Sequence, residues 1–412
     1  MVRTLDDATV DGRTVGVRVD VNSPLSEDGG LADDARLQAH VDTLAELLER
    51  GARVAVLAHQ GRPGGDEFAT LAPHTERFDE LLAHPVSHVD VNYGNPARAA
   101  IQDLDDGEAV LLENTRFYSE EYMEFDPSEA GDTHLVTELA PALDLYVNDA
   151  FAAAHRSQPS LVGFSQHLPS YAGRVMEREL DVLGTVGETD TPRVYVLGGA
   201  KVEDSIDVAW NVLERGLADT VLTAGLVGNV FLLADGVDVG RASREFVDEQ
   251  GYTDQIDRAR DLLDAHGDAI RFPLDVAVER DGDRTEVGIN LLPPEPGEAA
   301  MDVGQETVDS YRATLESAET VILNGPAGVF EEPSFQYGTR ALYAAATEVP
   351  TSIVGGGDTA AALRRLGVEG FNHVSTGGGA AMAALCDDPL PVVEALEAAP
   401  DERVAETGAD AS

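Results

Sequence analysis

The chain has 412 residues, of which 43% are hydrophobic, and its 76 acidic and 28 basic residues give a formal net charge of −48. Its length is enough for two domains and its hydrophobic content for folded cores, so the acidity is not a sign of disorder. A charge of this size argues against nucleic acid and anionic membrane surfaces as partners.

The composition also indicates the solvent in which the chain folds. At molar salt the Debye length is about 3 Å, which screens most of the repulsion between surface carboxylates. Lys201 is the only lysine in the sequence. A surplus of acid together with almost no lysine favours the salt-rich cytosol of an extreme halophile over an acidic protein from a mesophile.

Cysteine content and hydropathy narrow the class of protein further. Cys386 is the only cysteine, which excludes an internal disulfide and a cysteine-based zinc site. Its small apolar neighbours predict a buried, inert thiol rather than a catalytic one. Residues 1–7 contain no apolar signal region, and no apolar run reaches 18 residues. We therefore expect a soluble, cytoplasmic protein.

In the first half of the chain, short β-branched segments alternate with segments of helical periodicity. Strands are expected at residues 15–21, 53–58, 86–91, 109–112 and 144–147, and helices at residues 37–50, 75–82, 133–143 and 171–186. This alternation predicts βαβ units and parallel sheets covered by helices on both faces.

The second half resumes the alternation after a polar break at residues 187–192. Strands are expected at residues 194–197, 220–223, 270–272, 321–323, 352–354 and 373–375. We place a domain boundary at the break, giving domains at 1–186 and 187–393, with the long helix at about 171–186 joining them. Residues 394–412 are expected to form a short helix and a loose tail.

Glycine clusters follow three of the strands expected in the second half, at residues 198–201, 355–359 and 377–380. Ligands of parallel α/β sheets bind at the carboxyl ends of the strands. Glycine allows backbone N–H groups to approach an oxyanion, and the following helix adds its positive end. Three clusters at one edge, one with Lys201 and one with Asp358, predict a phosphate site. The sequence contains neither a P-loop nor a clear dinucleotide-binding fingerprint.

Basic side chains instead follow the strands of the first half. Singly, each arginine could be a solvated surface residue, but basic groups at five strand ends of so acidic a chain are unlikely to be chance. Arginine binds carboxylate and phosphate with two parallel hydrogen bonds, so we predict a pocket for a small phosphorylated anion. The basic groups are Arg18, Arg36, His59, Arg62, Arg116, His155 and Arg156, with Asp20 and Asn22 among them.

At this point the sequence resembles the phosphoglycerate kinase family, over residues from about 15 to about 384. The resemblance implies an α/β fold of two three-layer α/β/α domains, each with a mainly parallel Rossmann-like sheet, joined by a long helix and closing like a hinge. It also implies a monomer. The motifs that carry it are residues 18–22, 59–63, 113–117, 147–156, 198–204, 324–331, 355–359 and 375–380.

The resemblance implies that the N-terminal domain binds 3-phosphoglycerate or 1,3-bisphosphoglycerate. Asp20 and Asn22 would contact the glycerate, and Arg36 would also stabilise the transferred phosphoryl group. His155 would either join the basic patch or hold its arginines in place, the latter being the simpler role. The implied basic patch is Arg36, His59, Arg62, Arg116 and Arg156.

The same resemblance implies that the C-terminal domain binds Mg-ADP or Mg-ATP. Glu331 would bind the ribose, Asp358 would hold Mg²⁺, and Thr359 would reach a phosphate. Lys201, Gly377, Gly378 and Gly379 would act on the phosphoryl group in flight. The remaining implied nucleotide contacts are Gly199, Ala200, Gly304, Asn324, Pro326, Gly356 and Gly357.

One position departs from the family's pattern. The family commonly has a second lysine four residues after the first, where this chain has Ser205. We offer the hypothesis that a bound K⁺ ion replaces that cation.

Two other classes of protein have less support in the sequence than the kinase. A nicotinamide-dependent dehydrogenase lacks support because the dinucleotide fingerprint is absent. A non-catalytic nucleotide-binding or scaffold protein is favoured only by Ser205, while Lys201, Arg36 and Asp358 argue against it.

Overall fold

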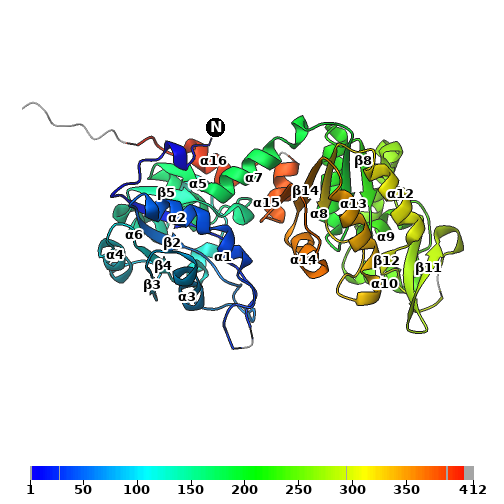
Figure 1. The fold of residues 1–412 in the computed structure, drawn as a ribbon, viewed down its shortest axis with the longest axis horizontal. Coiled ribbons are helices and arrows are strands. Elements are labelled where there is room, and N and C mark those ends of the chain that lie inside the picture. The colour runs from blue at the N-terminus through cyan, green and yellow to red at the C-terminus, as the bar shows by residue number, and fades with distance from the viewer. Residues whose placement is uncertain (1, 27, 294, 387, 403–412) are drawn as a thin grey trace, which may run out of the picture. The chain divides into compact units, whose positions relative to one another are not determined.

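The computed structural model describes residues 2–26, 28–293, 295–386 and 388–402, except for the side chain of Asp358. Its contacts divide the chain into two compact units, shown in Figure 1. Unit 1 comprises the chain up to Asp181 together with the C-terminal segment from Pro389, and unit 2 comprises Val182–Asp388. Each unit is an α/β structure built on its own six-stranded sheet.

The sheet of unit 1 is wholly parallel, in the order β3-β4-β2-β1-β5-β6. Its strands are β1 (Thr14–Arg18), β2 (Arg53–Leu57), β3 (Val86–Val89), β4 (Ala109–Leu112), β5 (Leu145–Asn148) and β6 (Ser170–Ala172). Its helices are α1 (Ala35–Ala39), α2 (Val41–Glu49), α3 (Ala72–Leu81), α4 (Asn95–Gln102), α5 (Pro127–Ala130), α6 (His134–Leu139) and α16 (Pro391–Ala398).

Alternation along β2 shows how unit 1 forms three layers. Val54 and Val56 join the core that contains Leu44 of α2 and Phe78 of α3, while Ala55 and Leu57 join the core that contains Ile101 of α4 and Leu139 of α6. Successive side chains of a strand point to opposite faces of the sheet. Helices therefore cover both faces, which is why β2 is buried along nearly its whole length.

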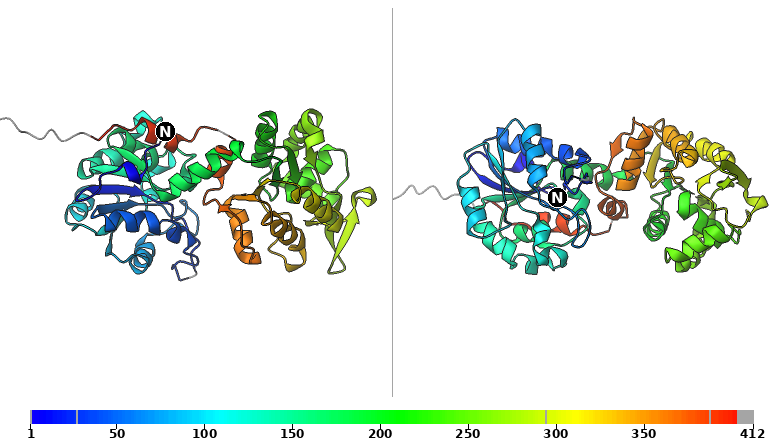
Figure 2. Two further views of the ribbon diagram at one scale, coloured as in Figure 1. Left: turned by 45° about the horizontal axis from the view of Figure 1, so that its top comes forward. Right: turned by 90° about the horizontal axis from the view of Figure 1, so that it is seen from below.

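Unit 2 has a second parallel sheet, in the order β15-β14-β13-β7-β8-β9, and a small antiparallel sheet in the order β11-β10-β12 (Figure 2). The parallel strands are β7 (Arg193–Leu197), β8 (Thr220–Thr223), β9 (Ile270–Arg271), β13 (Thr320–Asn324), β14 (Thr351–Gly355) and β15 (His373–Val374). The antiparallel strands are β10 (Asp275–Arg280), β11 (Asp283–Gly288) and β12 (Asp302–Val303).

In unit 2, α12 and α13 pack against β7 and β13 through one core that contains Tyr311, Leu342 and Val196. The helices are α8 (Val202–Glu214), α9 (Gly225–Ala234), α10 (Arg241–Glu249), α11 (Thr253–His266), α12 (Gln305–Leu315), α13 (Tyr337–Ala346), α14 (Gly357–Leu366) and α15 (Gly379–Leu385).

The expected single helix at residues 171–186 is wrong in its first part. Residues Ser170–Ala172 form β6 and pair with β5, and α7 (Arg174–Gly184) begins only after Gly173. Tyr171 is buried in the core beneath the sheet, so its hydrophobicity belongs to a strand. The expected helix at residues 37–50 is likewise two helices, since α1 ends before His40 and α2 begins after it.

Two further differences concern the ends of the units. The boundary between the two units falls within α7, between Asp181 and Val182, rather than after residue 186. The segment expected as a C-terminal helix and tail contributes α16 to unit 1, where the Arg3 guanidinium donates hydrogen bonds to the carbonyls of Ala399 and Pro400, both at 3.0 Å. Residues 403–412 of the expected tail lie outside the described residues. Among the helices that the structure describes, none is long and apolar enough to cross a membrane.

Candidate active site

The strand ends of unit 1 bring the predicted basic residues together around Asp20. The carboxylate of Asp20 is buried and accepts a hydrogen bond from the Arg36 guanidinium. Burial alone would raise the pKa of Asp20, but the positive charge of Arg36 and then of its other basic neighbours outweighs it and lowers the pKa to about 2. Asp20 is therefore a fixed anion at the centre of the cluster.

Asn22 and His59 are held beside this carboxylate. The backbone N–H of Asn22 donates to Asp20 at 3.2 Å, and the Asn22 side-chain oxygen accepts from the Gly61 N–H at 2.8 Å. His59 is buried, and burial together with the charge of Arg18 holds its pKa well below the usual value. His59 is therefore a neutral polar member of the predicted basic patch.

Arg18 has a larger part in this site than its position at a strand end suggested. Its side chain is 2% exposed. It lies 2.9 Å from Nδ1 of His59 and donates to the Ser160 hydroxyl at 2.9 Å. Ser160 in turn donates to the buried carboxylate of Glu121 at 2.7 Å. Arg18 thus fixes the His59 ring, and Glu121 fixes Arg18 through Ser160.

Arg116 and Arg156 complete the cluster from the ends of β4 and β5. Burial lowers the pKa of Arg116 to about 10, and the charges of Arg156, Arg18 and Arg62 add to the effect. Burial and then Arg62 also lower the pKa of Arg156. Within the described part of the chain, no carboxylate forms a salt bridge with Arg116 or Arg156. Guanidinium groups held together in this way favour an anionic ligand.

His155 supports one of these arginines. Burial lowers the pKa of His155 to about 4, with the charge of Arg156 adding to the effect. The neutral ring accepts a hydrogen bond at Nε2 from Nε of Arg156, at 3.1 Å. His155 therefore orients Arg156 and adds no positive charge to the cluster at neutral pH.

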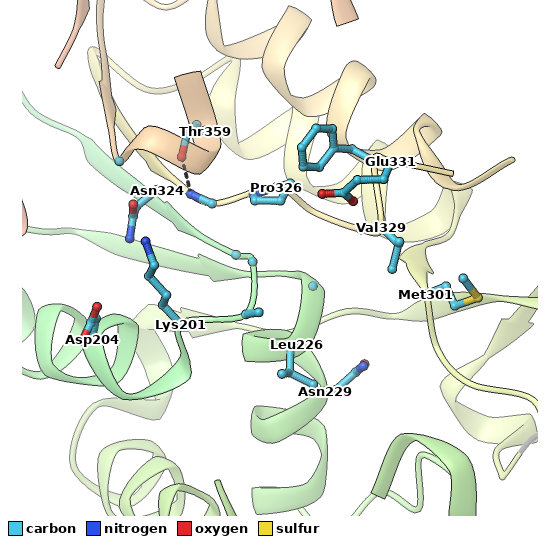
Figure 3. Close-up of a pocket in the computed structure, with 18 of the residues that line it drawn as sticks. Lys201, Asp204, Leu226, Asn229, Met301, Asn324, Pro326, Val329, Glu331 and Thr359 are labelled. Atoms are coloured by element: carbon cyan, nitrogen blue, oxygen red, sulfur yellow. Dashed lines mark hydrogen bonds between the residues drawn. The ribbon is translucent and has the colours of Figure 1, made fainter. Parts of the chain in front are cut away.

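Unit 2 contains a cavity of about 570 Å³ at the carboxyl ends of its parallel strands (Figure 3). The starts of four helices, α8, α9, α14 and α15, open onto it. Ten of the predicted nucleotide and transfer residues line it: Gly199, Ala200, Lys201, Asn324, Pro326, Glu331, Gly356, Thr359, Gly378 and Gly379. Gly304, Gly357 and Gly377 are not among the described residues that line it, and the Asp358 side chain lies outside the description.

Two glycine turns meet at the floor of this cavity. The Gly198 and Gly199 N–H groups donate to the carbonyls of Asn324 and Pro326, both at 2.7 Å. A Cβ on Gly325, whose φ is +86°, would lie 2.2 Å from the Gly198 carbonyl oxygen. Only glycine permits both this left-handed backbone and this close approach. The Gly325 N–H also donates to the Thr359 hydroxyl at 2.7 Å, which joins the turn to α14 (Figure 3).

The sequence did not indicate the apolar end of the cavity. Leu226, Phe246, Met301 and Val329 line it, as does the side chain of Asn229, which donates to the Ala300 carbonyl at 3.2 Å. Phe246 and Val329 are 46% and 39% exposed. Exposed apolar side chains grouped around a cavity are typical of a ligand site. An apolar wall beside glycine turns and helix starts suits a nucleobase.

Gly304 has a clear packing role at the start of α12. A Cβ there would lie 2.2 Å from the carboxylate of Asp275. That carboxylate accepts the Glu306 and Thr307 N–H groups, both at 2.9 Å. Gly304 therefore makes room for the side chain that caps α12.

Ser205 and Cys386 are both buried. The Ser205 hydroxyl is enclosed in the inner face of α8, with no hydrogen-bond partner among the described residues, and it does not line the cavity. The prediction of a buried thiol at Cys386 is confirmed, and burial raises its pKa to about 12. A thiol with so high a pKa is a poor nucleophile at neutral pH.

A family model described as phosphoglycerate kinase matches residues 5–387 of the chain. The chain belongs to the phosphoglycerate kinase family. The activity of this family is phosphoryl transfer to and from a carboxyl group, so the chain is a phosphotransferase.

The chain is similar over nearly its whole length to phosphoglycerate kinases of known sequence and of known structure. The chain is 64% identical over 395 residues to the phosphoglycerate kinase of Halobacterium salinarum, covering 96% of this chain and 99% of the relative. It is 62% identical over 398 residues to that of Natronomonas pharaonis, covering 96% and 100%. The phosphoglycerate kinase structure from Pyrococcus horikoshii matches with a TM-score of 0.91 at 41% identity, covering 96% of this chain and 98% of that chain.

Proposed function

We propose that the chain transfers a phosphoryl group reversibly between 1,3-bisphosphoglycerate and ADP, giving 3-phosphoglycerate and ATP. Unit 1 would hold the glycerate ligand and unit 2 the nucleotide. The observation that carries this proposal is the cavity in which Lys201, Glu331 and four helix starts converge beside an apolar wall. Backbone N–H groups and one lysine suit a polyphosphate, and the wall suits its base.

On the glycerate side, the cluster around Asp20 supports a ligand that carries both hydroxyl groups and negative charge. Asp20 and Asn22 would bind the glycerate hydroxyl, and Arg62, Arg116 and Arg156 would bind its phosphate. Because burial and then the charges of neighbouring guanidinium groups lower the pKa of Arg116, an anion placed among these groups relieves their repulsion. Arg36 would reach the carboxyl group from which the phosphoryl leaves.

On the nucleotide side, Glu331 would bind the ribose hydroxyls, and Asn324 and Thr359 would lie near the phosphates. Lys201, at the start of α8, would place its charge on the transferred group. The glycines at 377–379 would present backbone N–H groups to it. The two sets of residues lie in different units, so transfer requires their ligands to be brought together, and we propose that hinge closure does this.

The residues present fit a magnesium ion carried on the nucleotide. Asp358 lies in the first turn of α14, between Gly356 and Thr359, which both line the cavity. A carboxylate is a hard oxygen ligand of the kind that Mg²⁺ uses, and Mg²⁺ in kinases takes its other ligands from phosphates and water. We propose Asp358 as the protein ligand. When bound, the ion would neutralise phosphate charge.

No general base is needed for this reaction. The nucleophile is already an anion, a carboxylate in one direction and the ADP β-phosphate in the other. In-line phosphoryl transfer spreads charge over the equatorial oxygens in the transition state, so catalysis consists of positioning and electrostatic stabilisation. Arg36, Lys201 and the N–H groups at 377–379 would supply that stabilisation.

The assignment of the glycerate ligand to unit 1 and of the nucleotide to unit 2 can be tested with one variant in each unit. We expect Arg156→Ala to raise KM for 3-phosphoglycerate about 10-fold or more, since a charge-assisted hydrogen bond contributes about 1.5–3 kcal/mol, while KM for ATP stays within threefold. Glu331→Ala should raise KM for ATP and leave KM for 3-phosphoglycerate within threefold of wild type. Steady-state assays with each substrate varied in turn at molar KCl check both. Absence of any ADP-dependent turnover of 1,3-bisphosphoglycerate by folded wild-type protein would refute the function itself.

Ser205 is buried and does not line the cavity, so it would not itself hold a cation at the nucleotide. A separate proposal is that a K⁺ ion bound beside the nucleotide supplies the charge that a second lysine gives in other family members. The expected result is faster turnover in KCl than in NaCl at the same ionic strength, with ATP rather than 3-phosphoglycerate showing the change in KM. Equal rates in both salts would show that no K⁺ ion acts at the nucleotide.

A further inference from the structure

Beneath the glycerate site lies a buried pair of side chains that the roles proposed above leave unused. His40 is 3% exposed and Asp149 is fully buried. Nδ1 of His40 lies 2.6 Å from the Asp149 carboxylate, and Nε2 of His40 lies 3.0 Å from the backbone nitrogen of Asp20. The carboxylate needs a donor and the Asp20 N–H needs an acceptor. Nε2 of His40 also lies 3.1 Å from the Asp20 carbonyl oxygen. With the proton on Nδ1, the ring donates to Asp149 and Nε2 accepts from the Asp20 N–H, which satisfies both groups that need a partner.

One end of this pair reaches the proposed transfer machinery. Asp20 holds the Arg36 guanidinium through its carboxylate and is itself held by the His40 ring through its backbone. His40 also marks the break between α1, which carries Arg36, and α2. The ring thus fixes both the residue that orients Arg36 and the helix from which Arg36 projects.

The other end of the pair reaches the start of α7. The second carboxylate oxygen of Asp149 accepts the Val175 N–H at 2.8 Å and the Met176 N–H at 3.4 Å. A carboxylate at this position satisfies backbone N–H groups of the first helical turn and interacts favourably with the helix dipole. The chain passes from unit 1 to unit 2 along α7.

We propose that His40 and Asp149 are positioning residues for phosphoryl transfer. They fix the position of Asp20, and through it the position of Arg36, relative to the first turn of α7. Histidine suits the role because its two ring nitrogens point in different directions, one donating and one accepting. The proposal rests on the function proposed above, because it needs Arg36 to act on the transferred group.

Three substitutions at His40 separate its two hydrogen bonds. His40→Leu fills similar space and removes both. His40→Gln places its side-chain oxygen where Nε2 lies and can still accept from Asp20, whereas His40→Asn places its amide where Nδ1 lies and can still donate to Asp149. Supporting partners of this kind typically contribute 10- to 100-fold when removed. We expect kcat to fall in the order wild type, Gln, then Asn and Leu. KM for 3-phosphoglycerate should rise less than kcat falls, because Asp20 also contacts the glycerate, and KM for ATP should stay within threefold.

Two further variants show whether the effect passes through Arg36. In the Arg36→Lys background, His40→Leu should lower kcat much less than it does in wild type, because residues that act through one another are not additive. The matched control is Thr43→Val, which removes the hydrogen bond from the Arg174 N–H to the Thr43 hydroxyl, at 2.9 Å, and leaves Asp20 untouched. We expect this control to change the melting temperature more than kcat.

The measurements are steady-state kinetics and thermal melts of each variant at molar KCl. If His40→Leu does not fold, the Gln and Asn variants still decide, because each keeps one hydrogen bond and only the Gln variant should retain most of kcat. Equal losses in Gln and Asn, additivity with Arg36→Lys, or an equal loss of kcat in Thr43→Val would overturn the proposal. Wild-type protein without turnover would instead overturn the proposed function.

Discussion

Replacing Lys201 with alanine should lower kcat roughly 10²- to 10³-fold, the usual cost of removing one group that stabilises transition-state charge. Lys201 is the last residue before α8 and its exposed side chain lies in the cavity (Figure 3). Because the side chain is exposed, its loss should change the melting temperature little. KM for ATP should rise less than kcat falls, since the charge acts on the phosphoryl group in transit.

Lys201→Arg separates the presence of a charge from its geometry. An ammonium group is a compact charge with rotatable donors that can follow a moving phosphoryl group, whereas a guanidinium group is a planar fork suited to a fixed anion. We therefore expect arginine to restore little of the lost kcat. The control is Glu203→Gln, which changes an exposed charge in the first turn of the same helix. A coupled assay at molar KCl that found Lys201→Ala within threefold of wild type would refute this role for Lys201.

The parallel strands could be predicted from the sequence because they are buried on both faces and are therefore runs of β-branched residues. The small antiparallel sheet was missed although it left a signal. Asp281 and Gly282 have φ values of 53° and 86° in the turn between β10 and β11, and an Asp-Gly pair between alternating residues is a strong hairpin indicator. The strand β6 was missed because it has only three residues and runs directly into the periodicity of α7.

The candidate site could be predicted where its chemistry shows in residue type. Arginine, lysine and glycine at strand ends predict an anion site even when their neighbours in space are unknown. Leu226 and Met301 carry no such mark, and only the folded chain shows that they face the same cavity. His40 and Asp149 lie far apart in sequence, and neither stands in a pattern that predicts contact. Residues that act by positioning other residues are therefore the part of a site that is hardest to predict from a single sequence.

The second large effect we expect is loss of structure when salt is removed. The 76 acidic residues outnumber the 28 basic ones, so most carboxylates have no basic partner of their own. Several basic residues are already paired at close range, as where Arg174 joins Glu46 at 2.7 Å and Asp6 at 2.6 Å. The remaining carboxylates repel one another over about 10 Å at 0.1 M salt but only about 3 Å at 1 M.

Folding brings these carboxylates closer together than they are in the expanded chain, so their repulsion weighs more on the folded state. Far-UV circular dichroism should therefore show helix loss as KCl is diluted from molar concentration into low-salt buffer, with activity falling in parallel. NaCl at equal ionic strength should protect the fold as KCl does, since screening depends on ionic strength, whereas an equal osmolality of sucrose should protect it less. A spectrum unchanged after salt removal would mean that the cores of the two units outweigh the repulsion. The acidity would then reflect solubility rather than folding in brine.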